Sequence, residues 1–165
     1  MNITGLFHIA IKTDQLAKTV GFYVQVIGLQ TVERPDFGYP GAWLATPEGG
    51  AIIHIYAGGP ALGPAGEVPK GTAAIDHVSL TATGFHEFRD RISGAHLDWR
   101  EFIVPGTNLW QLFVYDPSGV QLELTFDGRE EFGPEPDMSP DRVYRPGVNF
   151  FDPDKYRHLG DSANL

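Results

Sequence analysis

The chain has 165 residues, 42% of them hydrophobic, and a formal net charge of −9. This length suits one domain or two small joined modules. The absence of cysteine excludes disulfides, thiolate metal sites and a cysteine nucleophile. No cluster of Lys and Arg would follow a phosphate backbone, so we do not expect nucleic-acid binding. No apolar run approaches the roughly 18 residues of a membrane span. The N-terminal segment lacks the regions of a secretory signal, so we expect a cytoplasmic protein.

Residues 1–56 predict one βαβββ module. A short apolar strand with a histidine near its centre, residues 6–12, precedes a helix whose apolar residues recur at helical spacing and which ends at Gly28. Three strand-like segments then follow, with the sequences ERPDF, AWLAT and AIIHIYA. The Gly- and Pro-rich residues 57–74 predict a linker or an exposed loop.

Residues 75–127 repeat the same order of parts and predict a second βαβββ module. A strand at 75–81 again carries a histidine, and a helix begins at Phe85 and ends at Gly94. Its three further strands have the sequences DWREFIV, LWQLFVY and VQLELTF. The proline-rich residues 128–165 predict a C-terminal arm that lies across the domain or a partner subunit.

Four ionisable residues occupy matching places in the two modules. His8 and His77 are 77 − 8 = 69 residues apart, and His54 and Glu123 are 123 − 54 = 69 apart. Alternation along each strand puts each of them on the smaller or more polar face, opposite the face that the helices would cover. Imidazole and carboxylate groups bind Fe, Mn, Ni and Zn as divalent ions. The four therefore predict a shared metal site, although each histidine alone also fits a hydrogen-bonded core or surface residue.

Four segments occur in a characteristic order: FHIAI, FYVQVIGL, DHVSL and DPSGVQLEL. Together they resemble the vicinal oxygen chelate superfamily over about residues 5–127. That superfamily includes glyoxalase I, extradiol dioxygenases, fosfomycin- and bleomycin-resistance proteins and methylmalonyl-CoA epimerase. The resemblance implies an α+β fold of two βαβββ modules, which form an open, cup-like mixed β-sheet with helices outside. It also implies a homodimer and one divalent metal ion, held by His8, His77 and Glu123, with His54 as a fourth ligand or a pocket residue.

The resemblance implies a metal-dependent enzyme whose small substrate chelates the metal through vicinal oxygen atoms. Extradiol dioxygenases use the same ligand set, and we favour their chemistry. Their motif has a tyrosine where this chain has Phe113, so His54, Tyr56 and Tyr115 are our candidates for proton transfer. A glyoxalase I-like lyase or isomerase is one alternative, although such enzymes usually place a carboxylate where His54 stands. A bleomycin resistance-like protein that sequesters a small ligand is the other.

Aromatic residues on or near the predicted strands are candidates for a substrate pocket. If they face inward, they favour an aromatic or otherwise flat substrate over a charged one. Ordinary core packing is the alternative for each of them. The candidates are Phe37, Trp43, Trp110 and Phe113.

Overall fold

The computed structural model describes residues 5–160, which form two compact units. The first comprises the described residues up to Pro69 together with Leu159 and Gly160, and the second comprises Lys70–His158. The division after Pro69 falls within the Gly- and Pro-rich segment between the two halves. In the described part of the chain, no helix has the length and apolar character needed to cross a membrane.

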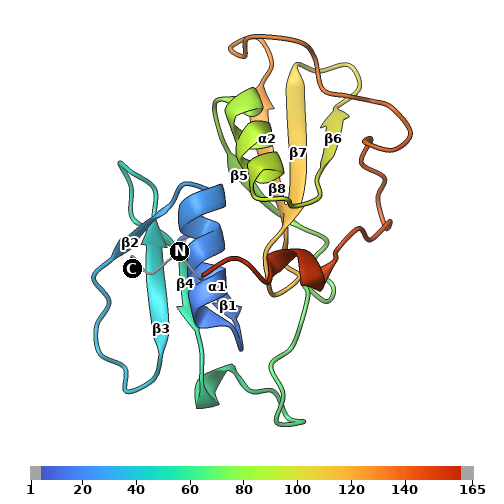
Figure 1. Cartoon of the computed structure of the whole chain (residues 1–165). Helices are drawn as coiled ribbons and strands as arrows, with labels where there is room; N and C mark the ends of the chain where they lie inside the picture. The colour runs from blue at the N-terminus through green and yellow to red at the C-terminus, as the bar shows by residue number, and fades with distance from the viewer. Residues whose placement is uncertain (1–4, 161–165) are drawn as a thin grey trace. The chain divides into compact units, whose positions relative to one another are not determined.

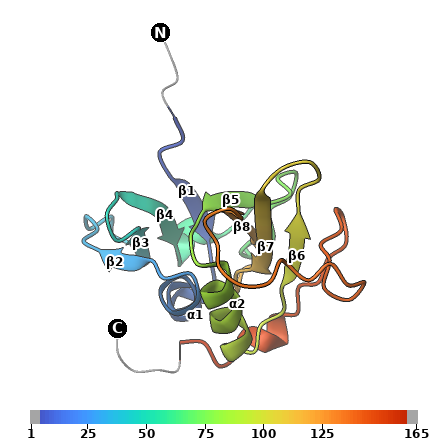
Figure 2. The same cartoon turned by 90° about the horizontal axis from the view of Figure 1, so that it is seen from above.

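The first unit is a four-stranded mixed sheet with one helix against it. Its strands lie in the order β1-β4-β3-β2, with β1 parallel to β4 and the other neighbours antiparallel. Helix α1 (Leu16–Gly21) packs near β4, continues as a π-helical segment (Phe22–Val26) and gives way to Gly28, which adopts a φ of 84° (Figures 1 and 2). The strands are β1 (Ile9–Lys12), β2 (Gln30–Val32), β3 (Gly41–Ala45) and β4 (Ala51–Tyr56).

The second unit has the same topology, with strand order β5-β8-β7-β6. Helix α2 (Phe85–Gly94) packs near β7 on one face of this sheet (Figure 2). Its strands are β5 (Val78–Thr81), β6 (Arg100–Ile103), β7 (Leu109–Tyr115) and β8 (Gln121–Asp127). The predicted α+β fold with two βαβββ modules is confirmed.

The register of the two sheets shows that the modules are copies of one pattern. Ala10 pairs with His54 between β1 and β4, and Ser79 pairs with Glu123 between β5 and β8. Each residue of the first pair lies 69 positions before its counterpart in the second pair, since 79 − 10 = 69 and 123 − 54 = 69. The spacing seen in the sequence is therefore a spacing in the hydrogen-bonded ladder.

Alternation along the closing strands separates the core from the opposite face. In the first unit Ile53 and Ile55 of β4 are fully buried, as is Phe22 after α1. In the second unit Leu122 and Leu124 of β8 are buried in the same way. His54 and Glu123 lie between these apolar residues, and the strand period of two turns their side chains to the other face.

Three predicted boundaries are wrong. The opening strands begin at Ile9 and Val78, so both histidines lie just before a strand, in segments that have no ladder partner. Leu6 and Phe7 are each 83% exposed in the first of these segments. Strand β2 precedes ERPDF, which forms a loop where the Arg34 guanidinium lies over the Phe37 ring. The first helix does end before Gly28 as predicted, although only Leu16–Gly21 is α-helical and Phe22–Val26 is π-helical.

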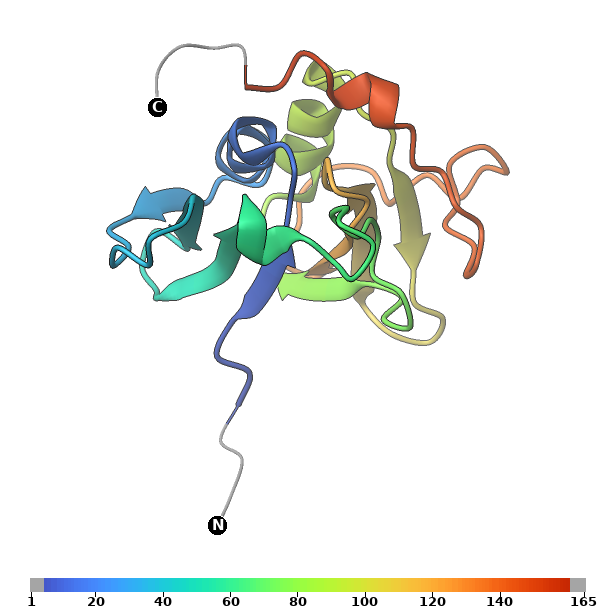
Figure 3. The same cartoon turned by 90° about the horizontal axis from the view of Figure 1, so that it is seen from below.

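The chain beyond β8 forms an irregular arm that packs on the second unit, shown in orange to red in Figures 1 and 3. Strand β6 holds it through Glu101, whose N–H donates to Arg142 O and whose carbonyl accepts from Tyr144 N, both at 2.9 Å. Near the end of the arm, the buried Tyr156 donates its hydroxyl to Tyr115 O at 2.7 Å. The arm is thus held at two separate points of the second sheet.

Candidate functional site

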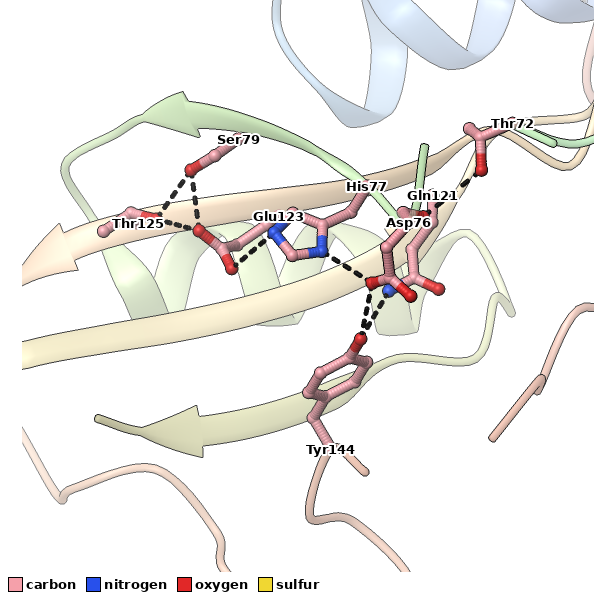
Figure 4. Close-up of polar contacts among 8 residues, drawn as sticks. All are labelled: Thr72, Asp76, His77, Ser79, Gln121, Glu123, Thr125 and Tyr144. Atoms are coloured by element: carbon pink, nitrogen blue, oxygen red, sulfur yellow. Dashed lines mark hydrogen bonds and ion pairs between the residues drawn. The ribbon is translucent and has the colours of Figure 1, made fainter. Parts of the chain in front are cut away.

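His77 and Glu123 form the centre of the candidate site in the second unit. His77 Nε2 lies 3.2 Å from Glu123 Oε2 (Figure 4). Glu123 is only 6% exposed and lies on β8, which has β5 on one edge and β7 on the other. Burial of a carboxylate without a partner would cost on the order of several kcal/mol. Its neighbours must therefore compensate the charge.

Two hydroxyl groups support one oxygen of Glu123. Ser79 on β5 and Thr125 on β8 each donate to Oε1 at 2.7 Å, and their own oxygens lie 3.0 Å apart. Ser79 is the ladder partner of Glu123, and Thr125 lies two residues farther along the same strand face. Together they fix the carboxylate so that Oε2 is the oxygen that faces His77.

A second carboxylate orients His77 from the other side of its ring. Asp76 Oδ1 lies 2.8 Å from His77 Nδ1 and also accepts from the Tyr144 hydroxyl at 2.9 Å. The hydrogen bonds from His77 and then from Tyr144 lower the pKa of Asp76, which is therefore an ionised acceptor at neutral pH. A carboxylate only accepts, and the contact at Nδ1 is shorter than the 3.2 Å contact at Nε2, so a neutral imidazole here carries its proton on Nδ1 and its lone pair on Nε2.

This arrangement fits a metal ion. Two acceptor atoms, His77 Nε2 and Glu123 Oε2, face each other at 3.2 Å, and only a cation or an added proton makes that contact favourable. Two ligands about 2.1 Å from one ion, at a tetrahedral or octahedral angle, lie about 3.0 to 3.4 Å apart. Imidazole and carboxylate are ligands of Fe(II), Mn(II), Ni(II) and Zn(II).

In the first unit, three flat rings stack on one another. The rings of His8 and His54 are 3.8 Å apart, and Trp43 lies 4.4 Å from His54 on its strand partner β3. Burial, followed by the neighbouring His8, lowers the pKa of His54, while a backbone interaction with Ala51 opposes the shift. His54 is therefore neutral at pH 7, as a metal ligand or a general base must be. His8 Nδ1 is buried without a hydrogen-bond partner.

Each of the two pairs, His8 with His54 and His77 with Glu123, thus lies within its own unit. Within residues 5–160, no three His, Asp or Glu side chains come together in a group that could hold a metal ion. The proposed ligands are the members of these two pairs.

The other predicted site residues occupy different environments. Phe113 is the strand partner of Glu123 and meets the His77 ring edge to face at 5.6 Å. Tyr115 lies under Phe150 of the arm, and burial raises its pKa. Tyr56 packs edge to face on Tyr39.

Two of the predicted pocket residues lie farther from the paired ligands. Phe37 contacts Trp43 from the loop after β2, with ring centroids 6.1 Å apart. Trp110 packs on Phe85 of α2, on the helix-covered face of the sheet. We therefore leave Trp110 out of the proposed site.

Sequence reasoning did not assign a role to several residues of this network. Asp76 had a signal, because it precedes His77 directly, and alternation also turns Ser79 and Thr125 toward Glu123. Tyr144 had none, since it comes from the arm and lies 68 residues from Asp76 in sequence. Its ring stacks on Phe113, the residue that occupies the position of the tyrosine in the extradiol motif.

The comparisons with known proteins bear on the family. A model described as the Glyoxalase/Bleomycin resistance protein/Dioxygenase superfamily matches residues 5–124. The chain belongs to this superfamily. The resemblance noted from the sequence is confirmed. Enzymes of the superfamily typically use a divalent metal ion, and its members bind small-molecule substrates and are often dimers.

The sequence identity to individual relatives is low. "Glyoxylase I 4" of Arabidopsis thaliana is 26% identical over an alignment of 131 residues that covers 75% of this chain and 71% of the relative. A putative glyoxalase family protein from Bacillus anthracis has a TM-score of 0.60 at 18% identity and covers 77% of this chain and 98% of its own. Lactoylglutathione lyase from Agrobacterium tumefaciens has a TM-score of 0.58 at 16% identity, covering 80% and 100%. The similarity to these two structures supports the fold described for this chain.

Proposed function

We propose that this chain is a divalent-metal-dependent enzyme whose small substrate binds the metal through two adjacent oxygen atoms. The observation that carries the proposal is the contact between His77 Nε2 and Glu123 Oε2 at 3.2 Å, where two acceptor atoms face each other. His8 would supply the ligand of the first module, and His54 would be a further ligand or a general base. Such an ion would act as a Lewis acid and a template for the substrate.

The residues around the ligands have separate roles. Asp76 holds the Nδ1 proton of His77, and Ser79 and Thr125 hold Glu123 by its other oxygen. Partners of this kind fix ligand orientation and raise metal affinity. The lowered pKa of His54 keeps an imidazole available to accept a proton, and Tyr56 and Tyr115 are further candidates for proton transfer.

We favour an extradiol-type dioxygenase among the possible reactions. Trp43 lies beside His54 on the adjacent strand, and Phe113 lies in the same way beside Glu123. In both modules a flat ring thus accompanies the polar residue of the closing strand, which suits a flat aromatic substrate with two neighbouring hydroxyl groups. The similarity to "Glyoxylase I 4" favours a lyase or isomerase of the glyoxalase I type as the second candidate.

Metal analysis of protein purified without chelator tests the proposal. We expect stoichiometric metal in the wild-type chain and its loss in His77→Ala. His158→Ala is the matched control, because His158 is an exposed histidine of the same unit. A wild-type chain without metal, or a His77→Ala variant with full metal content, would contradict the enzyme proposal and favour a protein that sequesters a small ligand.

The metal and its oxygen dependence separate the two reactions. Bound iron with O₂ uptake in the presence of a catechol is the expected result for the dioxygenase. Nickel or zinc with no O₂ uptake would overturn it in favour of the lyase or isomerase. A homodimer is part of the proposal, and sedimentation of the intact chain measures it.

A further inference from the structure

The arm beyond β8 brings one side chain to the candidate site. Glu101 on β6 is 1% exposed, and both of its backbone groups bond to the arm, at Arg142 and Tyr144. Its side chain adds a third bond, because Oε2 accepts from Asp137 N at 2.7 Å. The backbone of Tyr144 is thus fixed beside the edge strand.

Ring packing then directs the Tyr144 hydroxyl. The ring stacks face to face on Phe113, with centroids 3.6 Å apart and planes 8° apart. The hydroxyl accepts from Gln121 Nε2 at 3.2 Å and donates to Asp76 Oδ1 at 2.9 Å (Figure 4). The amide nitrogen of Gln121 can only donate and the Asp76 carboxylate can only accept, so the directions of both hydrogen bonds are fixed.

The same oxygen of Asp76 receives both hydrogen bonds, one from Tyr144 and one from His77 Nδ1. The Asp76 side chain is 57% exposed, so without the hydroxyl it would be free to turn toward solvent. A carboxylate that turns away no longer holds the proton on Nδ1.

On the basis of the proposed function, we propose that Tyr144 is a positioning residue of the metal site. Through Asp76 it holds His77 in the Nδ1–H tautomer, with Nε2 directed at Glu123. The family match ends at residue 124, so Tyr144 lies outside the matched region, whereas Asp76 and His77 lie within it.

The test replaces the hydroxyl and keeps the ring, in Tyr144→Phe of the full-length chain. ¹⁵N NMR of the metal-free protein, above the ordinary pKa of histidine, measures the tautomer of His77. Calorimetry measures the affinity for Zn²⁺ added alone. We expect a smaller fraction of the Nδ1–H tautomer and Zn²⁺ binding about 10-fold weaker, the lower end of the effect of losing an outer partner of a ligand.

Tyr156→Phe is the matched control, because it removes another hydrogen-bonded hydroxyl of the arm. It should leave the His77 tautomer and the Zn²⁺ affinity unchanged. Asp76→Ala should reproduce the effect of Tyr144→Phe, and the double variant should be no worse than Asp76→Ala alone. Since Asp76 is exposed, this variant also breaks the link if Tyr144→Phe does not fold.

An unchanged tautomer and unchanged Zn²⁺ affinity in a folded Tyr144→Phe would show that the tyrosine only packs the arm, and would overturn the inference. A wild-type chain that binds no metal would instead overturn the proposed function. The tautomer measured in metal-free protein would still decide the role of Tyr144.

Discussion

Glu123 shows how much a single position can reveal about a site. The sequence QLELTF places a carboxylate between apolar residues, and the structure buries it on the face opposite Leu122 and Leu124. Two hydroxyl donors satisfy Oε1, whereas Oε2 faces His77. This asymmetry is the feature expected of a ligand, in which one oxygen is anchored and the other is presented.

The hydroxyl pair should therefore affect metal affinity. Ser79→Ala removes one donor to Oε1, and we expect metal binding to weaken by about 10-fold, since second-layer partners of a ligand contribute on this scale. Adding Thr125→Val removes the second donor and should weaken binding further. Calorimetric titration with Zn²⁺ measures both. Ser93→Ala, at an exposed serine on α2, is the control, and an affinity unchanged in the double variant would contradict an anchoring role.

Helix α2 is stabilised by the start of the arm. No side chain caps it locally, but Glu131 accepts from Gly84 N at 3.0 Å and from Phe85 N at 2.7 Å. A carboxylate at this end satisfies two free N–H groups and interacts favourably with the helix dipole. Glu131 lies outside the βαβββ pattern, and yet it stabilises helix α2, which belongs to that pattern.

Glu131→Ala should lower the free energy of unfolding by about 1 kcal/mol, the usual cost of losing an N-terminal cap. Urea denaturation followed by circular dichroism measures this change. Glu130→Ala removes the neighbouring exposed carboxylate and should have little effect. Equal losses in both variants would mean that charge alone, and not the two hydrogen bonds, stabilises the helix.

The elements that sequence reasoning predicted correctly are those with a strong period. Alternation placed Ile53, Ile55, Leu122 and Leu124 on the core face, and the helical spacing from Phe85 located α2. The errors occur where no period constrains the chain. Leu6 and Phe7 are apolar, but residues 6–8 have no strand partner. The loop after β2 is ordered by Arg34 over aromatic rings, which depends on contacts within the loop.

The candidate site could be proposed from the sequence only where one strand could be compared with its repeat. His8, His54, His77 and Glu123 follow from matching positions in the two modules. Tyr144 could not be found in this way, because its position depends on a backbone bond to Glu101 and on stacking against Phe113. Both contacts join parts of the chain that are distant in sequence, and no local pattern encodes them.

The two modules share one sheet pattern, but different residue types occupy two matching positions in it. Trp43 pairs with His54 in the first sheet, and Phe113 pairs with Glu123 in the second. One module therefore presents a neutral imidazole and the other a carboxylate. A divalent ion bound by neutral imidazoles and one carboxylate would keep a net charge of +1, which favours a substrate with an ionised oxygen atom.

The proposal takes ligands from both modules, so it predicts that metal binding stabilises the chain as a whole. A ligand at 100 times its Kd adds about 2.7 kcal/mol to the native state, and each kcal/mol corresponds to about 2–4 °C in Tm for a chain of this size. We therefore expect excess chelator to lower the Tm of the metal-loaded protein by about 5–10 °C. His8→Ala and His77→Ala should each abolish this sensitivity. If His8→Ala kept the full response to chelator while His77→Ala lost it, the metal would belong to the second module alone, because only ligands that hold the ion can transmit its removal to the folded state.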